Sequence, residues 1–214
     1  MEKIKKQHFI INLNKRKDRW KEVCQEFTEI GIDVPIRMRA IVNEECGLLG
    51  CALSHIRCLE QAKEKCWDYV LIVEDDVHFP HPELVKDFID KNINKDFDVL
   101  FLGCTCQKGK KEGDLIRILQ STCLHAYIVK KHYYQRLLNN FYEGYVKKIK
   151  TWKTNLTYDK NNVDVYLQKL QKQNKWYAPL QCLATQKVGY SDNFKTISDQ
   201  QHDHFTPRIS VNNE

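Results

Sequence analysis

Three consecutive carboxylates, Glu74, Asp75 and Asp76, directly follow the most hydrophobic run of the sequence, residues 69–73. Because side chains alternate along an extended chain, Glu74 and Asp76 are expected to point to the same side. Three adjacent negative charges repel one another, and a bound cation offsets that repulsion. Two carboxylates combined with substrate phosphate oxygens are a usual way of holding Mg²⁺ or Mn²⁺. We therefore interpret Glu74 and Asp76 as metal ligands; the alternative is a solvated acidic turn before a helix.

A divalent cation at this point would suit a substrate that carries a diphosphate. In a nucleotide sugar the diphosphate is the leaving group, and a cation offsets the charge that develops as the glycosidic bond breaks. The protein must also bring an acceptor hydroxyl into line with that bond. Inversion at the sugar carbon requires one general base on the acceptor side, normally a carboxylate.

A second group of chemically capable residues is spaced like one face of a helix. Cys51, His55 and Cys58 fall at positions i, i+4 and i+7, and three soft ligands on one face could hold zinc. Free cysteines also act as small buried hydrophobic residues, and we favour that interpretation because no second ligand pair lies nearby. Nine cysteines are an odd number, so a complete intramolecular disulfide framework is excluded.

The elements that must position these residues alternate between strand and helix. Apolar, β-branched runs predict strands at residues 8–13, 34–40, 68–73, 97–103 and 125–129. Helical spacing of apolar residues predicts helices at residues 20–30, 51–65, 82–93, 133–141 and 163–170. Turns or loops are expected at residues 47–50, 104–114 and 151–162, the second of these being mobile. The alternation predicts an α/β fold, Rossmann-like, with a mostly parallel sheet flanked by helices; such sheets bind ligands where residues 74–76 lie, at the carboxyl ends of their strands.

Length and composition agree with one such domain. The chain has 214 residues, 42% hydrophobic and 29% charged, which excludes a wholly disordered chain and a disulfide-stapled mini-protein. A mean hydropathy of −0.58 and the lack of a long apolar run argue against a transmembrane segment. The polar N-terminus shows no signal peptide, so we expect a cytoplasmic protein. A net charge of +6 favours anionic ligands such as nucleotide phosphates but is weak for a nucleic-acid-binding surface.

Three segments, in order along the chain, resemble motifs of glycosyltransferase family 25. Residues 11–19 (INLNKRKDR) are similar to its opening motif, residues 50–55 (GCALSH) to its second and residues 69–77 (YVLIVEDDV) to its third. The resemblance spans residues 9–192, because further matching positions are residues 122–129, Asp164, Gln186, Ser191 and Asp192. The family includes bacterial lipopolysaccharide β-galactosyltransferases and procollagen galactosyltransferases.

This resemblance implies a GT-A fold, a UDP-sugar donor, Mn²⁺ (or Mg²⁺) and inversion of configuration. The acceptor stays open among a glycan, a glycolipid and a protein. Family members usually carry a longer insert between the second strand and the second motif, where this chain has only residues 41–49. We expect one domain, residues 1–214, with the nucleotide sugar bound by 1–103, the acceptor side formed by 104–200 and an irregular tail at 201–214.

The first and second motifs supply the expected donor contacts. Asn12 and Leu13 would meet the nucleotide mainly through backbone groups. Arg16 and Arg19 would pair with the diphosphate, since arginine binds phosphate bidentately. Ser54 and His55 lie in the second motif, near the start of the predicted helix 51–65, where donors can face phosphate or sugar hydroxyls.

The remaining carboxylates complete the expected site. Asp75 would meet ribose or sugar hydroxyls beside the metal ligands Glu74 and Asp76. Asp164 is our choice for the general base; the alternative is that it caps the helix it opens. Asp192 is the second choice for the base, or else a contact to the donor.

Together these features predict an inverting, metal-dependent transferase that moves galactose or glucose from UDP to a hydroxyl. Two rivals belong to other classes. The short segment 41–49 motivates a non-catalytic remnant that binds sugar nucleotides. A metal-dependent phosphoesterase would need a second metal shell, for which only His202 and His204 are available, and we favour a solvated tail there.

Overall fold

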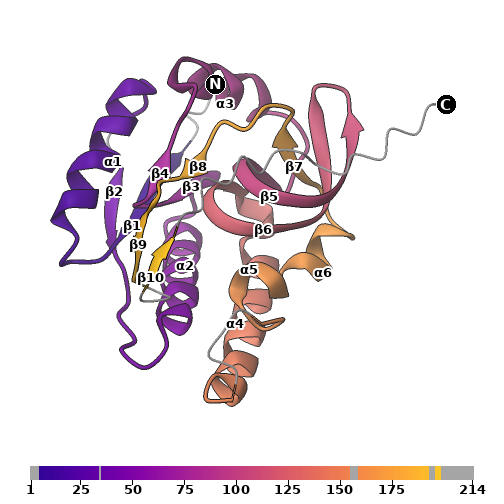
Figure 1. The fold of residues 1–214 in the computed structure, drawn as a ribbon. Helices are drawn as coiled ribbons and strands as arrows, with labels where there is room; N and C mark the ends of the chain where they lie inside the picture. Colours follow the sequence, from indigo (N-terminus) through magenta and orange to yellow (C-terminus); the bar gives the residue numbers. More distant parts are fainter. Residues whose placement is uncertain (1–4, 34, 155–158, 193–195, 199–214) are drawn as a thin grey trace.

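A computed structural model describes residues 5–33, 35–154, 159–192 and 196–198. Its main sheet has six strands in the order β2-β1-β3-β6-β5-β7 (Figure 1). These strands are β1 Lys6–Asn12, β2 Ile36–Arg39, β3 Tyr69–Glu74, β5 Val99–Glu112, β6 Leu115–Lys130 and β7 Trp176–Pro179. Five of them run in one direction and β6 runs in the other, which confirms the mostly parallel sheet.

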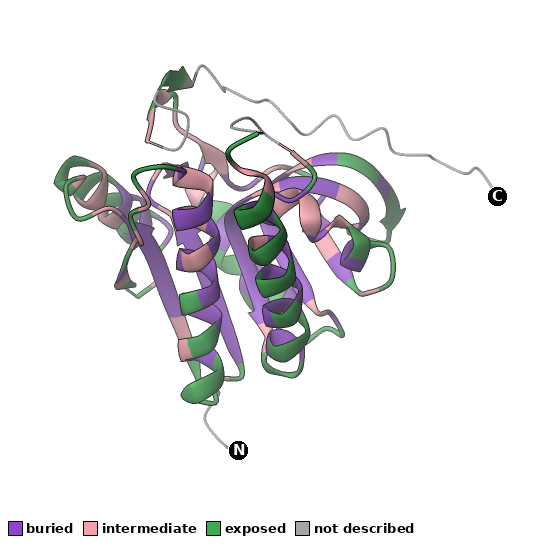
Figure 2. Ribbon diagram, turned by 90° about the horizontal axis from the view of Figure 1, so that it is seen from below, coloured by how far each residue is buried: buried purple, intermediate pink, exposed green. Residues whose placement is uncertain are grey.

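The helices cover both faces of this sheet. Their bounds are α1 Lys17–Glu29, α2 Gly47–Glu64, α3 Pro82–Asn92, α4 Tyr134–Thr151, α5 Val163–Tyr166 and α6 Gln168–Gln171, with a 3₁₀ turn at Lys131–Tyr133. Apolar side chains of α1 and α3 share one core with the sheet, and those of α2, α4, α5 and α6 share the other. Figure 2 shows the buried strands lying behind two helices whose outward faces are exposed. The six described α-helices include none that is long and apolar enough to cross a membrane.

The central strand β3 explains why the acidic turn has a fixed position. Val70 and Ile72 belong to one core and Leu71 and Val73 to the other, and all four are at most 1% exposed. A strand buried on both faces reads as a continuous apolar run, as the sequence predicts. Each such side chain contributes about 1.5–3 kcal/mol on burial, so the end of β3 is firmly held.

Two predicted loops are wrong. Residues 104–114 are not a mobile loop, because β5 and β6 continue through them as a long hairpin that turns at Gly113. The lysines of this strand are exposed, and its buried position is a glycine, where a Cβ would lie 2.6 Å from Ile116 Cγ2. Residues 107–112 therefore have no alternation of apolar and polar side chains from which a strand could have been predicted. Residues 47–50 form the first turn of α2 rather than a separate turn.

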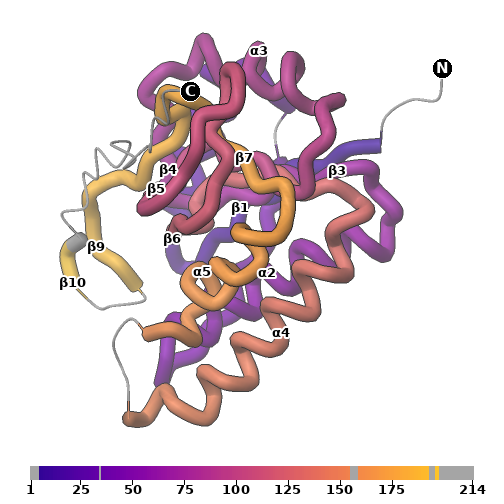
Figure 3. The backbone as a smooth tube through the Cα atoms, turned by 90° about the vertical axis from the view of Figure 1, so that its right-hand side faces the viewer, coloured from indigo at the N-terminus to yellow at the C-terminus, as the bar shows by residue number. Residues whose placement is uncertain are grey.

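Two small sheets lie apart from the main one. β4 (Val77–His78) pairs with β8 (Thr185–Gln186), and β9 (Gly189–Ser191) pairs with β10 (Thr196–Ser198). Figure 3 shows β9 and β10 lying to one side of the main sheet. The pairing of β4 with β8 brings the late part of the chain to the residues that follow β3.

Candidate active site

A cavity of about 600 Å³ lies where β1, β2 and β3 end. β1 contributes Ile11, with Leu13 just beyond it, and the segment after β2 contributes residues 40–44. Its remaining walls come from α2, the acidic turn and the end of β9, and their lining residues include Gly47, Cys51, Ser54, Glu74, Asp75, Asp76, Ser191 and Asp192. The carboxyl ends of neighbouring strands thus form the cavity, as expected of an open α/β sheet.

The three carboxylates face this cavity from the end of β3. Their side chains are 23% (Glu74), 10% (Asp75) and 21% (Asp76) exposed. The Arg19 Nη1 group donates to Asp75 Oδ1 at 2.9 Å and to Asp76 Oδ2 at 3.2 Å. The same guanidinium donates through Nη2 to the carbonyl of Tyr190 at 2.9 Å. The acidic turn is therefore not the solvated turn that was the alternative interpretation.

Burial and mutual repulsion set the protonation of this cluster. Burial and the charge of Glu74 raise the pKa of Asp76 to about 7, against the opposing charge of Arg19. Burial also raises the pKa of Asp75, although Arg19 and Asn12 oppose the shift. Burial acts against ionisation of Glu74 too, but the hydrogen bond and charge of His55 lower the pKa of Glu74 overall. Arg19 and His55 alone do not compensate three ionised carboxylates.

The donor atoms of this cluster fit a hard divalent cation. The Gln186 amide on β8 donates to Glu74 Oε2 at 3.3 Å and to Asp76 Oδ1 at 3.4 Å. One polar group thus lies within reach of both carboxylates, which places oxygens of Glu74 and Asp76 around a common point. Mg²⁺ and Mn²⁺ prefer such oxygen ligands, and a bound cation would reduce the repulsion that raises the pKa of Asp76.

His55 acts behind the cavity rather than in it. Its side chain is fully buried, with Nδ1 2.9 Å from the Tyr127 hydroxyl and Nε2 3.0 Å from Glu74 Oε1. Ser54 does line the cavity, but its hydroxyl donates to the Gly50 carbonyl at 2.7 Å and accepts from the Ile41 amide at 2.8 Å. The second motif therefore positions Glu74 and the wall at residue 41.

The first motif likewise contains residues that line the cavity and residues that hold other side chains in place. Leu13 and Arg19 line the cavity, while Asn12 is buried and its Nδ2 donates to Asp75 Oδ2 at 2.6 Å. Arg16 pairs with Asp18 at 2.9 Å and with Asp192 at 3.0 Å, and it is not part of the cavity lining. Arg19 is thus the arginine that the structure brings to the carboxylates, whereas Arg16 fastens the segment around Asp192.

The two candidate bases have different surroundings. Asp164 is the second residue of α5, so it is not the N-cap, and its Oδ2 accepts from the Cys123 amide at 3.2 Å. It lies outside the cavity lining, yet its charge acts together with burial and Glu74 to raise the pKa of Cys51. Asp192 lies in the lining and pairs with Lys15 at 2.6 Å. Although burial opposes the shift, Lys15 and Arg16 lower the pKa of Asp192, which makes it a poor base.

Several cavity residues were not found from the sequence. Lys15 and Asn43 line the cavity, and Arg37 of β2 donates through Nε to Asn12 Oδ1 at 2.8 Å. Arg37 lies in the predicted strand 34–40 and Asn43 in the segment 41–49, and neither belongs to one of the three motifs, so no signal identified them as site residues. Lys15 lies inside the first motif and could have been chosen on charge alone. His202, His204 and the tail at 201–214 lie outside the described residues.

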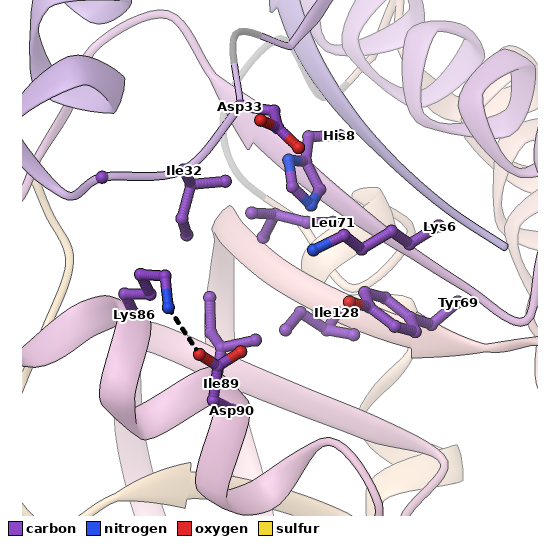
Figure 4. Close-up of a pocket in the computed structure, with 11 residues that line it drawn as sticks. Lys6, His8, Ile32, Asp33, Tyr69, Leu71, Lys86, Ile89, Asp90 and Ile128 are labelled. Atoms are coloured by element: carbon purple, nitrogen blue, oxygen red, sulfur yellow. Dashed lines mark hydrogen bonds and ion pairs between the residues drawn. The ribbon is translucent and has the colours of Figure 1, made fainter. Parts of the chain in front are cut away.

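A second cavity, of about 140 Å³, lies near the starts of β1 and β3, away from the strand ends that form the larger cavity (Figure 4). Its lining includes Lys6 and His8 from the start of β1 and Tyr69 from the start of β3, and Lys86 pairs there with Asp90 at 2.8 Å. None of the carboxylates at the end of β3 lines it. We therefore place the candidate site at the larger cavity alone.

Two solved structures with a similar backbone are glycosyltransferases, at low sequence identity. A Drosophila β1,4-galactosyltransferase 7 mutant, in complex with manganese, UDP-Gal and xylobiose, aligns with a TM-score of 0.51 at 8% identity over 97% of this chain and 82% of that chain. A glycosyltransferase involved in glycosylation of the major capsid of PBCV-1 aligns with a TM-score of 0.41 at 11% identity over 81% of this chain and 91% of that chain. The first of these shows the fold, which is the GT-A type expected from the sequence.

Sequence comparison supplies the family. Among curated proteins, none matches this chain. Residues 45–154 match the profile described as glycosyltransferase family 25 (LPS biosynthesis protein). The matched range contains the second and third motifs, the helix α2 and the three cavity carboxylates. Because it covers more than half of the 214 residues, the chain belongs to glycosyltransferase family 25, and it is a glycosyltransferase.

Proposed function

We propose that this glycosyltransferase moves a hexose, galactose or glucose, from a UDP-sugar to a hydroxyl, with Mn²⁺ or Mg²⁺ and with inversion. One observation carries the proposal: three partly buried carboxylates line a cavity of about 600 Å³ together with Arg19. A cavity of that volume is in the range of small-molecule sites. The Drosophila galactosyltransferase, solved with manganese and UDP-Gal, adds support by its fold.

The residues around the cavity can be given distinct tasks. Glu74 and Asp76 would hold the cation, which when bound supplies positive charge for the diphosphate leaving group. Arg19 already touches both aspartates, so its guanidinium can turn to a phosphate oxygen when the cation takes over those carboxylates. Asp75, held by Asn12, would accept a hydrogen bond from a ribose or sugar hydroxyl.

The nucleotide side and the acceptor side follow from the cavity walls. Leu13 would meet the nucleotide, and Asp192 would contact the donor from the segment that follows β9. Ser54 would shape the wall at residue 41, because its hydroxyl donates to the Gly50 carbonyl and accepts from the Ile41 amide. Asp164 remains our proposed base, because it matches the family at its position and lies on α5 in the acceptor half, residues 104–200. Residues 1–103 supply most of the donor side, completed by Ser191 and Asp192.

The test of the metal assignment compares two carboxylates. We expect wild-type protein to release UDP from one member of a UDP-sugar panel in the presence of Mn²⁺, and Asp76→Ala to lose both this turnover and Mn²⁺ binding. Asp87→Ala is the matched control, because Asp87 is an exposed carboxylate of α3 away from the cavity. If Asp76→Ala retains turnover and Mn²⁺ binding, Asp76 is not a ligand.

A separate variant tests the base. Asp164→Asn should abolish transfer while leaving UDP binding intact, since the amide cannot remove a proton from the acceptor.

The stereochemical outcome is measured by NMR, from the anomeric configuration of the product at the start of the reaction. Unchanged turnover in Asp164→Asn would remove it as the base, and retention at the anomeric carbon would contradict the inverting mechanism. UDP-sugar binding without transfer to any glycan, glycolipid or protein acceptor would favour the non-catalytic alternative. The cytoplasmic location expected from the sequence stays a prediction.

A further inference from the structure

Three ligand-type side chains from two elements meet at the edge of the main cavity. Cys51 and His55 lie one turn apart on α2, and Glu74 ends β3. Glu74 Oε1 lies 3.0 Å from His55 Nε2 and 3.9 Å from Cys51 Sγ, and the three ligand atoms are all within 4.8 Å of one another. Of the three residues considered from the sequence as zinc ligands, Cys51 and His55 do lie together. Cys58 is buried in the core instead, and Glu74 is the third residue of the group.

The spacing of these atoms is close to that of a tetrahedral zinc site. With Zn–N near 2.0–2.1 Å, Zn–O near 2.0–2.2 Å and Zn–S near 2.3 Å, a tetrahedral ion separates N and O by about 3.4 Å and S and O by about 3.6 Å. The observed separations of 3.0 and 3.9 Å differ from these by a few tenths of an ångström. Side-chain rotation alone can supply such a shift, because Cys51 and Glu74 are both partly exposed.

The surroundings of His55 suit a metal ligand. A metal-bound imidazole donates its other ring N–H to a nearby acceptor, which fixes the ring orientation. Nδ1 of His55 lies 2.9 Å from the Tyr127 hydroxyl, and both residues are fully buried. The Tyr127 oxygen can accept that N–H, leaving Nε2 free to coordinate.

The fourth position of such a site opens onto the cavity. Cys51 and Glu74 both belong to the cavity lining, so a water or a ligand group can reach an ion held between them. Three protein ligands with one open position are the arrangement of zinc sites that bind a water or a substrate, rather than of closed structural sites.

We propose that Cys51, His55 and Glu74 form a binding site for a soft divalent ion of the zinc class. Binding removes the proton of the Cys51 thiol, which passes to solvent, and leaves a Zn–thiolate bond. This site is distinct in its ligands from the hard-ion site at Glu74 and Asp76, but the two share Glu74. Zinc and manganese therefore compete, a consequence that rests on the proposed function.

Cobalt(II) is the probe for the first test, because a cobalt–thiolate bond gives a near-ultraviolet charge-transfer band that oxygen ligands do not give. We expect wild-type protein to show this band with one equivalent of Co²⁺, and Cys51→Ser to lose it. Cys24→Ser is the matched control, since Cys24 is also a partly exposed helical cysteine and lies on α1. It should keep the band.

Zinc affinity, measured by competition with a chelating dye, provides the second readout. Tyr127→Phe keeps the ring and removes the acceptor for Nδ1, so it should weaken zinc binding by about 10–100-fold. Cys51→Ser should weaken zinc binding more than Tyr127→Phe does. Thermal unfolding of each variant establishes that it is folded. No band in wild-type protein, or a band that persists in Cys51→Ser, overturns the proposal.

Competition for Glu74 is measured separately by the electron paramagnetic resonance signal of free Mn²⁺. Adding one equivalent of Zn²⁺ to the Mn²⁺-loaded wild-type protein should raise that signal, and adding it to Cys51→Ser should raise it less. Absence of Mn²⁺ binding in the first place would count against the proposed function alone, because the cobalt band does not depend on it. Bound Mn²⁺ that zinc fails to displace, with the cobalt band present, would overturn the sharing of Glu74.

Discussion

Arg19 is the residue on which the proposed donor site depends most directly. It contacts Asp75, Asp76 and the Tyr190 carbonyl, and it lines the cavity. We expect Arg19→Ala to weaken UDP binding by about tenfold to a hundredfold, since a hydrogen bond to a charged group contributes about 1.5–3 kcal/mol. Isothermal titration calorimetry with UDP and Mn²⁺ measures this. Arg57→Ala on α2, outside the cavity lining, is the control, and equal affinity in both variants would contradict the assignment.

The sequence predicts which residues lie at the site better than it predicts the contacts that each of them makes. The carboxylate run after a fully apolar strand was sufficient to predict where Glu74, Asp75 and Asp76 lie. It could not show that Asn12 holds Asp75, because that contact joins residues 63 positions apart. Nor could it show that His55 turns to Glu74 and Tyr127 instead of the cavity, since orientation depends on how α2 packs against the sheet.

Gly50, in the first turn of α2, lies too close to the backbone of residue 41 to be replaced by a larger residue without a shift. A Cβ at this position would lie 2.3 Å from the Ile41 carbonyl oxygen, which belongs to backbone and cannot rotate away. We expect Gly50→Ala to lower the free energy of unfolding by about 1–3 kcal/mol, and to weaken UDP binding because residues 41–44 form a cavity wall. Urea denaturation and calorimetry measure the two effects.

Gly113 provides the comparison for Gly50. A Cβ there meets nothing within 4 Å, but its φ of +62° belongs to the left-handed region. Gly113→Ala should therefore lower the free energy of unfolding by about 1–2 kcal/mol with UDP affinity unchanged. If Gly50→Ala binds UDP as tightly as Gly113→Ala does, the wall at residue 41 does not shape the nucleotide site.

Glu26 joins α1 to the segments that carry the acidic turn. It is buried and accepts from the Phe79 amide at 3.0 Å, and it also lies 3.0 Å from His78 Nδ1 and 3.1 Å from Lys187 Nζ. Burial opposes its ionisation, yet these partners lower the pKa of Glu26 below its usual 4.5. The stabilisation is thus fully present above about pH 4.5 and is lost as pH falls through the lowered folded-state value.

Replacement of Glu26 by glutamine tests whether the ionised carboxylate stabilises the fold. Glu26→Gln should lower the free energy of unfolding by about 1–3 kcal/mol at neutral pH, and the difference from wild type should shrink as the solution is acidified. Denaturation at a series of pH values provides the measurement. Glu29→Gln, an exposed position on the same helix, should show no such trend. A difference that stays constant down to acid pH would contradict the role of the charge.

The strands and helices that bury apolar side chains could be predicted from the sequence. From β1 to α4 the main strands and helices occur in the predicted order, because each has apolar residues at the spacing of a strand or a helix that pack into one or both cores. The lysine-rich half of β5 was missed since its pairing with β6 is made by backbone groups and its side chains lie in solvent. The two-residue strands β4 and β8 are too short to show any period, although they bring Gln186 to the carboxylates.

For the molecule as a whole, ligand binding and folding should be coupled through the cation. At a UDP concentration of about 100 times Kd, binding adds about 2.7 kcal/mol to the free energy of unfolding. For a chain of this size that corresponds to a rise in Tm of about 5–10 °C. Differential scanning fluorimetry should show this rise with UDP and Mn²⁺ together and a smaller rise when EDTA is present. A rise of the same size with and without EDTA would contradict a metal-assisted nucleotide site.

The acidic turn is contacted by residues that follow the main sheet in the sequence. The Lys187 amide donates to the Asp76 carbonyl at 2.7 Å, Gln186 reaches both proposed metal ligands, and the Tyr190 carbonyl holds Arg19. All six strands of the main sheet are complete by Pro179. A nascent polypeptide on the ribosome can therefore assemble its sheet before it acquires a finished nucleotide pocket. Competence to bind the donor should therefore arise only after residues 186–192 have left the exit tunnel, later than the sheet itself.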